Sequence, residues 1–244
     1  MMGTRVVLII PFYNEEERVF FQDFHEAFHT YKKLDFVLVD DGSNDATPRI
    51  LKQLSEEFSN VNHIILDLNN GKAAAIREAV LRVDAKNYDY IGYLDADLAT
   101  PIEEIARIYD FATQNQQFNF IMGSRIKLLG NTIQRSLKRH YFGRVFATIV
   151  SQVVLKIPVY DTQCGAKIIK MNLAIAIFKK PFITKWLFDV ELLLRFKQLD
   201  PQFELKTIEL PLQTWIEKGN SKIKFSDLLK VPFQLLKIYF HYVR

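Results

Sequence analysis

The chain has 244 residues, of which 49% are hydrophobic and 25% are charged, as in a globular protein with an ample core. This length suits one large domain, or one domain with an appendage. A single cysteine, Cys164, excludes an internal disulfide and fits a reducing compartment. The formal net charge of +4 gives no sign that nucleic acid is a partner. We expect no signal peptide and no membrane span, because no apolar stretch reaches the required length.

The first part of the chain alternates apolar runs with helical patterns. Residues 5–11 form a continuous apolar run, which predicts a strand buried on both faces, and a helix follows to about Tyr31. The loop between them lacks the G-x-G-x-x-G pattern, which argues against a dinucleotide-binding enzyme. A second strand, residues 36–39, ends on Asp40 and Asp41, acids that can accept hydrogen bonds from a ribose or a base. Turn chemistry alone explains the glycine and serine that follow, but not two adjacent acids.

A lysine marks the start of the next helix. A third strand, residues 61–66, leads into Asn70, Gly71 and a helix that runs to about Val83. Lys72 falls in the first turn of this helix, where the macrodipole disfavours a positive charge. That conflict favours contact with a phosphate or a base, and a solvated lysine is the alternative.

The fourth strand, residues 88–94, ends on two carboxylates, Asp95 and Asp97, and a helix start follows at Thr100-Pro101. The two acids therefore lie in a strand-to-helix loop, at the sheet edge where open α/β folds bind ligands. Because alternate residues of an extended chain point the same way, both carboxylates can face one hard cation such as Mg²⁺. The alternative is a helix cap with a solvated acid.

A fifth strand, residues 118–122, completes five strand-helix alternations, which predict an α/β fold with a mostly parallel sheet covered on both faces. Beyond Arg125 the pattern changes. Arg135 and Arg139 share one face of a predicted helix, which suits phosphate binding or is simply solvated. A later helix carries Asp189 in its first turn, where either the helix dipole or a site role accounts for it. A late strand is expected over residues 203–210.

Eight short motifs occur in an order that resembles family 2 inverting glycosyltransferases of the GT-A fold, and within them the dolichyl-phosphate glucosyltransferase branch. They are residues 11–15 (PFYNE), 40–43 (DDGS), 70–72 (NGK), 95–97 (DAD), 123–125 (GSR), 161–165 (DTQCG), 186–191 (WLFDVE) and 215–222 (WIEKGNSK). The resemblance implies a GT-A fold with a Rossmann-like sheet. We expect this chain to lack the N-terminal membrane anchor of the eukaryotic members.

The resemblance also implies roles for individual residues. A divalent metal, Mg²⁺ or Mn²⁺, would be held by Asp97, with Asp95 on the metal or the ribose. Catalytic roles would fall to Asp97, Asp161, Arg125 and Arg139. Substrate-binding roles would fall to Pro11, Tyr13, Glu15, Asp40, Asp41, Lys72, Asp95, Ser124, Arg135, Gln163, Asp189 and Lys222.

Three hypotheses for the function stay open at this point. The first is inverting transfer of a hexose, glucose from UDP-glucose, to a polyprenyl or dolichyl phosphate, giving a β-linked product. The second is transfer to a glycan or another alcohol in surface polysaccharide synthesis, with Asp161 as the base. The third is a nucleotide-sugar-binding protein without turnover, which the intact motif residues argue against. A comparison of lipid-phosphate and glycan acceptors separates the first two.

The C-terminal segment predicts how the chain meets a lipid acceptor. Residues 1–222 would form the catalytic domain, with a nucleotide-sugar half (1–125) and an acceptor half (126–222), and residues 223–244 an amphipathic basic helix. Such a helix can lie in a lipid interface, which would place the protein peripherally at the cytoplasmic membrane face. The alternative is that the helix packs on the domain's own core or on a second subunit, as a homodimer.

Overall fold

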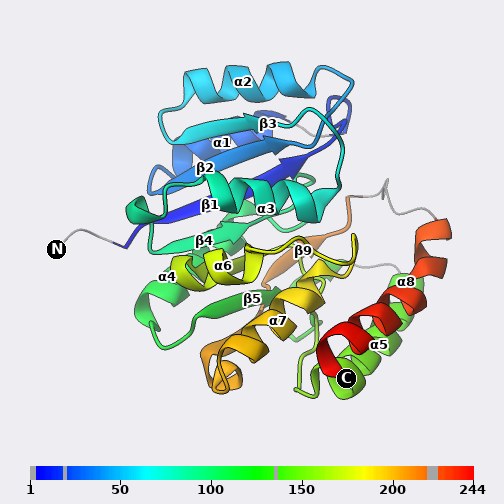
Figure 1. Cartoon of the computed structure of the whole chain (residues 1–244). Coiled ribbons are helices and arrows are strands. Elements are labelled where there is room, and N and C mark those ends of the chain that lie inside the picture. The colour runs from blue at the N-terminus through cyan, green and yellow to red at the C-terminus, as the bar shows by residue number, and fades with distance from the viewer. Residues whose placement is uncertain (1–3, 19–20, 135–136, 219–224) are drawn as a thin grey trace.

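The computed structural model describes residues 4–18, 21–134, 137–218 and 225–244, with residues 137–142 and 225–229 described by their backbone. In this part of the chain one seven-stranded sheet runs through the molecule (Figure 1). Its strands, in spatial order, are β3 (Val61–Ile65), β2 (Leu34–Asp40), β1 (Val6–Phe12), β4 (Tyr90–Tyr93), β7 (Lys167–Lys170), β5 (Phe120–Ser124) and β8 (Thr207–Pro211). A small second sheet pairs β6 (Thr132–Gln134) with β9 (Thr214–Ile216).

The large sheet is mostly parallel, which confirms the predicted fold class. Strands β3, β2, β1 and β4 run parallel, as do β5 and β8, whereas β7 is antiparallel to both β4 and β5. The apolar run of β1 explains its central place, because residues 6–10 are all buried and a strand covered on both faces needs apolar side chains on each.

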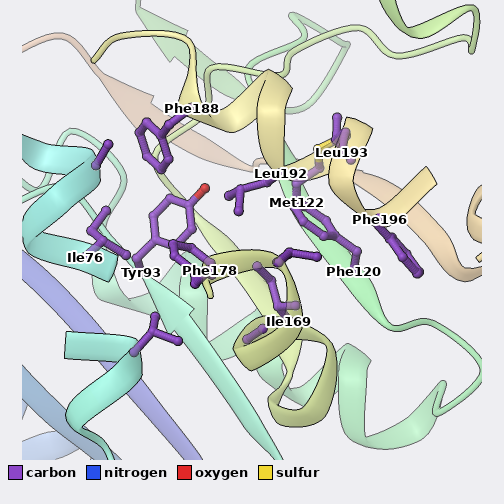
Figure 2. Close-up of a cluster of buried hydrophobic side chains, with 14 of the residues drawn as sticks. Ile76, Tyr93, Phe120, Met122, Ile169, Phe178, Phe188, Leu192, Leu193 and Phe196 are labelled. Atoms are coloured by element: carbon purple, nitrogen blue, oxygen red, sulfur yellow. The ribbon is translucent and has the colours of Figure 1, made fainter. Parts of the chain in front are cut away.

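Helices cover both faces of the sheet, and each face has its own apolar cluster. One cluster joins the sheet to α3 (Lys72–Arg82), α6 (Met171–Phe178) and α7 (Phe188–Leu199). The other joins it to α1 (Phe21–Thr30), α2 (Thr47–Glu57) and α4 (Ile102–Gln114). Figure 2 shows part of the first cluster, where Tyr93, Phe120 and Ile169 of the strands meet Phe178 and Leu192 of the helices.

The expected strand limits differ from the observed ones, most of all for the last two strands. Residues 203–206 form a 3-10 turn, and β8 begins only at Thr207. The turn is set by Asp200, whose carboxylate accepts the Gln202 amide and whose carbonyl accepts the Phe203 amide, a local alternative to strand pairing. Strand β5 runs two residues further than expected and includes Gly123 and Ser124, which pair with β8.

The C-terminal helix α8 (Phe225–Ile238) and the π-helical turn Tyr239–Val243 pack one face on the sheet's first cluster. Ile238 is fully buried (0% exposed), and the Tyr242 hydroxyl lies 3.0 Å from both Arg195 Nε and Glu191 Oε2 on α7. The opposite face is open, since Phe233 is 73% exposed. Of the alternatives for this helix, packing on the domain's own core therefore accounts for one face. None of the described helices is long and apolar enough to cross a membrane.

The two faces of α8 predict different stabilities for two substitutions. Ile238→Ala should lower the free energy of unfolding by about 2–5 kcal/mol, because it opens a cavity in the core. Phe233→Ala should change it by less than about 0.5 kcal/mol, because the ring is exposed. Urea denaturation followed by circular dichroism measures both. Equal effects of the two substitutions would contradict the packing of α8 on the core.

Candidate active site

The chain's polar motifs meet at one edge of the sheet because of strand direction. The parallel strands β3, β2, β1, β4 and β5 all end at this edge. Strand β7 is antiparallel and so begins there, which brings in the loop of residues 161–165. Open α/β sheets bind ligands beyond the carboxyl ends of their strands. The edge therefore collects loops that lie far apart in the sequence.

The loops after β1 and β2 form one wall, joined by hydrogen bonds. The Asn14 amide donates to Ser43 Oγ at 2.8 Å, the Asn44 amide to Asn14 Oδ1 at 2.8 Å, and the Glu15 amide to Thr47 Oγ1 at 2.9 Å. Asn14 has a positive φ of 47°, which asparagine tolerates better than most residues. Pro11 and Tyr13, half-buried, belong to the same wall, and Glu15 is buried in it.

The acids at the end of β2 have different partners. Asp41 accepts the backbone amides of Asn70 at 3.0 Å and Gly71 at 2.8 Å, which fixes the start of α3 beside it. Burial raises the pKa of Asp41, although these two amides act in the opposite direction. Asp40 accepts the Ser43 amide at Oδ2, whereas its buried Oδ1 has no hydrogen-bond partner within the described ranges. A ligand donor can satisfy that oxygen.

Asp95 and Asp97 lie in a turn after β4, not in the extended segment that the sequence suggested. The Leu98 amide donates to the Asp95 carbonyl at 3.2 Å, and Leu98 has a φ of +49°. Burial raises the pKa of Asp97, and the negative charge of Asp95 raises it further. The two carboxylates are therefore still close enough to interact. Lys72 Nζ lies 2.5 Å from Asp95 Oδ1 and forms an ion pair with it, which brings a positive charge next to the two carboxylates.

This donor set fits a hard divalent cation that also binds substrate oxygens. Asp95 and Asp97 supply carboxylate oxygens, and Mg²⁺-like ions often use one or two carboxylates plus phosphates. Among the residues that the structure describes, no group of three or more histidine, cysteine or acidic side chains could hold a metal alone. The remaining ligands would have to come from substrate or water.

A second ion pair lies across the site. Arg125 holds Asp161 through both carboxylate oxygens, with Nε 2.6 Å from Oδ2 and Nη2 2.8 Å from Oδ1. Glu209 of β8 accepts the backbone amides of Tyr160 and Asp161 at 2.7 Å and 2.6 Å, which fixes the loop that carries the pair. Glu209 went unrecognised in the sequence, where it is one acid in a half-buried strand.

The Arg125–Asp161 pair lines a pocket of about 260 Å³ beneath α5 (Leu137–Ile149) and the π-helical turn Val150–Leu155. Arg144 and Gln163 also line it. Its apolar wall includes Phe146 and Val159. Such a mixed lining suits an anionic group that is joined to an apolar chain.

Asp189 lies beneath the site. It is 4% exposed, and its Oδ1 accepts the Tyr93 hydroxyl at 2.5 Å and the Lys167 ammonium at 2.7 Å. Burial and the adjoining carboxylate raise the pKa of Tyr93 well above its usual value, so the hydroxyl stays protonated and donates. Lys167 was missed in the sequence, and its signal is a charged residue in an otherwise apolar strand, Lys-Ile-Ile-Lys.

The other predicted site residues differ in how much of them the structure describes. Ser124 is buried at the end of β5, beside Arg125. Arg139 lies in residues 137–142 of α5, of which the structure describes the backbone alone. Arg135 and Lys222 fall outside the described residues. The substrate, metal and catalytic roles of all these residues stay predictions.

The model of glycosyl transferase family 2 matches residues 7–178, well over half of the chain. The chain belongs to glycosyl transferase family 2. This glycosyltransferase is 28% identical over 246 residues to dolichyl-phosphate beta-glucosyltransferase ALG5A of Trichomonas vaginalis, covering 95% of this chain and 72% of that protein. It is also 28% identical over 252 residues to the dolichyl-phosphate beta-glucosyltransferase of Homo sapiens, covering 97% and 75%.

The fold of the glycosyltransferase is shared with solved structures. Glucosyl-3-phosphoglycerate synthase from Mycobacterium tuberculosis, in complex with Mn²⁺, UDP-glucose and phosphoglyceric acid, aligns with a TM-score of 0.71 at 13% identity, covering 97% of this chain and 78% of that one. At this identity the likeness extends to the fold alone. It confirms the predicted GT-A architecture of the glycosyltransferase.

Gly165 gives a test of how the two sides of the site approach each other. A Cβ built at this position would overlap the Asp95 carboxylate, so Gly165→Ala should displace Asp95 and reduce sugar transfer by about tenfold or more. Steady-state transfer rates measure the effect. Gly130→Ala is the control, since its Cβ would meet no atom within 4 Å and adds only backbone strain. Equal rates for Gly165→Ala and the parent would contradict the close approach.

Proposed function

We propose that this glycosyltransferase transfers glucose from UDP-glucose to a polyprenyl phosphate and inverts the anomeric configuration. The names of the relatives in Trichomonas vaginalis and Homo sapiens support this choice of acceptor class and sugar. UDP-glucose bound to the Mycobacterium tuberculosis structure supports the choice of donor. Residues 1–125 would then hold the donor and residues 126–222 the acceptor.

The observation that carries the choice of acceptor is the pairing of Asp161. An alcohol acceptor needs a general base that takes its proton. The Arg125 guanidinium binds both carboxylate oxygens of Asp161, and its positive charge opposes the uptake of a proton there. A phosphate acceptor is already ionised at neutral pH and needs no such base. Arg125 and Arg144 around the pocket, with Arg139 on the same helix as Arg144, suit a phosphate.

On the donor side, the chain's own residues would bind and orient the sugar nucleotide. Asp40 Oδ1, which has no partner among the residues that the structure describes, would receive the base and the ribose together with Asp41, Tyr13 and Glu15. Asp97, with Asp95, would hold Mg²⁺ or Mn²⁺, which when bound neutralises the charge that develops on the leaving diphosphate. Lys72 sits beside this pair and would add a second positive charge for the diphosphate.

The proposal is tested with purified protein, UDP-glucose, Mn²⁺ or Mg²⁺, and two acceptors, a polyprenyl phosphate and an alcohol of equal chain length. We expect transfer to the phosphate alone. Asp97→Asn keeps the size of the side chain but removes its charge, so it should lose nearly all transfer, at least about 100-fold, with an unchanged circular dichroism spectrum. Transfer to the alcohol alone would favour glycan-type acceptors. UDP-glucose binding without turnover on either acceptor would favour a binding protein.

We further propose that the enzyme works peripherally at an anionic membrane surface, at the cytoplasmic face. Support comes from what we term the apolar helix face, exposed side chains on α8 with its π-turn and on α5 with its own π-turn. These are Phe233, Leu236, Phe240, Val145, Ile149 and Val153. Helix α8 contacts the π-turn after α5, and in Figure 1 the two helices lie side by side. Anionic headgroups would add about 1 kcal/mol for each nearby basic residue, such as Lys230 and Arg244.

Flotation with anionic liposomes at low salt tests the membrane proposal. The parent should float, and the triple variant Phe233→Ser, Leu236→Ser, Phe240→Ser should stay in the soluble fraction, because its apolar contact area is lost. The control variant Leu68→Ser, Leu205→Ser changes two equally exposed leucines and should float like the parent. A parent that stays soluble but sediments as a dimer, which the triple variant abolishes, would assign the face to a second subunit.

A further inference from the structure

A fully buried lysine at the start of β7 has no place in the chemistry described above. Lys167 is 0% exposed and pairs with Tyr93 of β4 in the sheet register. Its Nζ donates to the Cys164 carbonyl at 2.5 Å and to Asp189 Oδ1 at 2.7 Å. A buried charge is costly, and an apolar side chain could fill the same space at lower cost. The groups that Lys167 contacts therefore indicate its role.

One of its contacts leads to the donor loop, the turn of residues 95–98 that carries Asp95 and Asp97 after β4. Asp189, which accepts from Lys167, also accepts the Tyr93 hydroxyl at the same oxygen. Tyr93 is two residues before Asp95, so its ring anchors the start of the donor loop. Figure 2 shows this ring among apolar side chains, including Phe188, whose ring centre is 5.9 Å away. Water does not compete for the hydrogen bond there, which strengthens it.

The other contact leads to the acceptor loop. The Cys164 carbonyl that Lys167 holds belongs to the loop of residues 161–165. Asp161 begins this loop, and Gly165 ends it against the Asp95 carboxylate. The single ammonium of Lys167 is thus joined to both sides of the site: directly to the acceptor loop, and through Asp189 and Tyr93 to the donor loop.

We propose that Lys167, Asp189 and Tyr93 form a positioning unit that sets the distance between the donor loop and the acceptor loop. The inference rests on the proposed function of these two loops. None of the three residues touches substrate in this role. Transfer requires the acceptor oxygen to lie in line with the anomeric carbon, and an error of about 1 Å in such a geometry can cost about 100-fold in rate. Donor binding uses the wall formed by the loops after β1 and β2 together with Asp95 and Asp97 of the donor loop itself. It therefore depends on the donor side alone and not on the distance to the acceptor loop.

The test compares two tyrosines of the same strand. Tyr93→Phe removes one oxygen atom from the unit. We expect kcat for transfer to fall about tenfold or more, while KM for UDP-glucose changes less than about threefold. Tyr90→Phe is the matched control, because Tyr90 is also buried in β4 but donates to Ala112 on the other face. It should leave both constants unchanged. If the Tyr93 hydroxyl only stabilises the fold, Tyr93→Phe should behave like Tyr90→Phe. Both variants would then have a lower melting temperature and, at low temperature, the kcat of the parent.

A second pair of variants covers the buried charges. Lys167→Met alone leaves Asp189 buried without its cation and should be poorly stable. Lys167→Met with Asp189→Asn removes both charges and keeps an oxygen for Tyr93, so its melting temperature should recover toward that of the parent. Transfer should stay low, because the Cys164 carbonyl has lost its donor. Transfer within about twofold of the parent, in Tyr93→Phe or in the double variant, would overturn the proposal.

The assays use whichever acceptor the parent enzyme glycosylates. Failure of the lipid phosphate as acceptor therefore overturns the proposed function and leaves this comparison intact. Loss of kcat with constant KM in Tyr93→Phe and the double variant supports the positioning unit with any acceptor.

Discussion

The site depends on the direction of one short strand. Strand β7 lies between β4 and β5 and runs against both, so it begins at the edge where its parallel neighbours end. A parallel strand in that place would carry its preceding loop to the far edge. Because β7 is reversed, the loop of residues 161–165 arrives beside Asp95, and Gly165 leaves room for that carboxylate. Donor and acceptor loops, more than sixty residues apart in the chain, become neighbours through this reversal.

The reversal also brings acids close together, and three of them pair with a cation from another element. Lys72 of α3 pairs with Asp95 after β4, Lys167 of β7 with Asp189 of α7, and Arg125 after β5 with Asp161 before β7. Unpaired acids would repel one another and an anionic substrate. Cross-element pairing removes that repulsion and at the same time ties the loops to one another.

Much of this arrangement was predictable from the sequence, because it depends on local pattern. Apolar runs predicted β1, β2 and β4, and the acids that follow the last two runs placed Asp40, Asp41, Asp95 and Asp97 at one edge. The antiparallel course of β7 was not predictable, since nothing in Lys167–Lys170 encodes strand direction. The burial of Asp189 was also missed, because a helix-start acid looks the same whether it faces water or a buried lysine. These features depend on partners distant in the chain, which local patterns do not report.

The docking of α8 has a consequence for how the protein is made. Ile238 and Tyr242 cover an apolar cluster whose other members come from β1, β2 and β4 onward. On the ribosome those strands emerge first, and domains form as their residues become available. The cluster stays partly uncovered until residue 242 has left the exit tunnel. Until then the nascent chain carries an exposed apolar face beside α7 and the π-helical turn Val150–Leu155, where chaperones that recognise such surfaces can bind it.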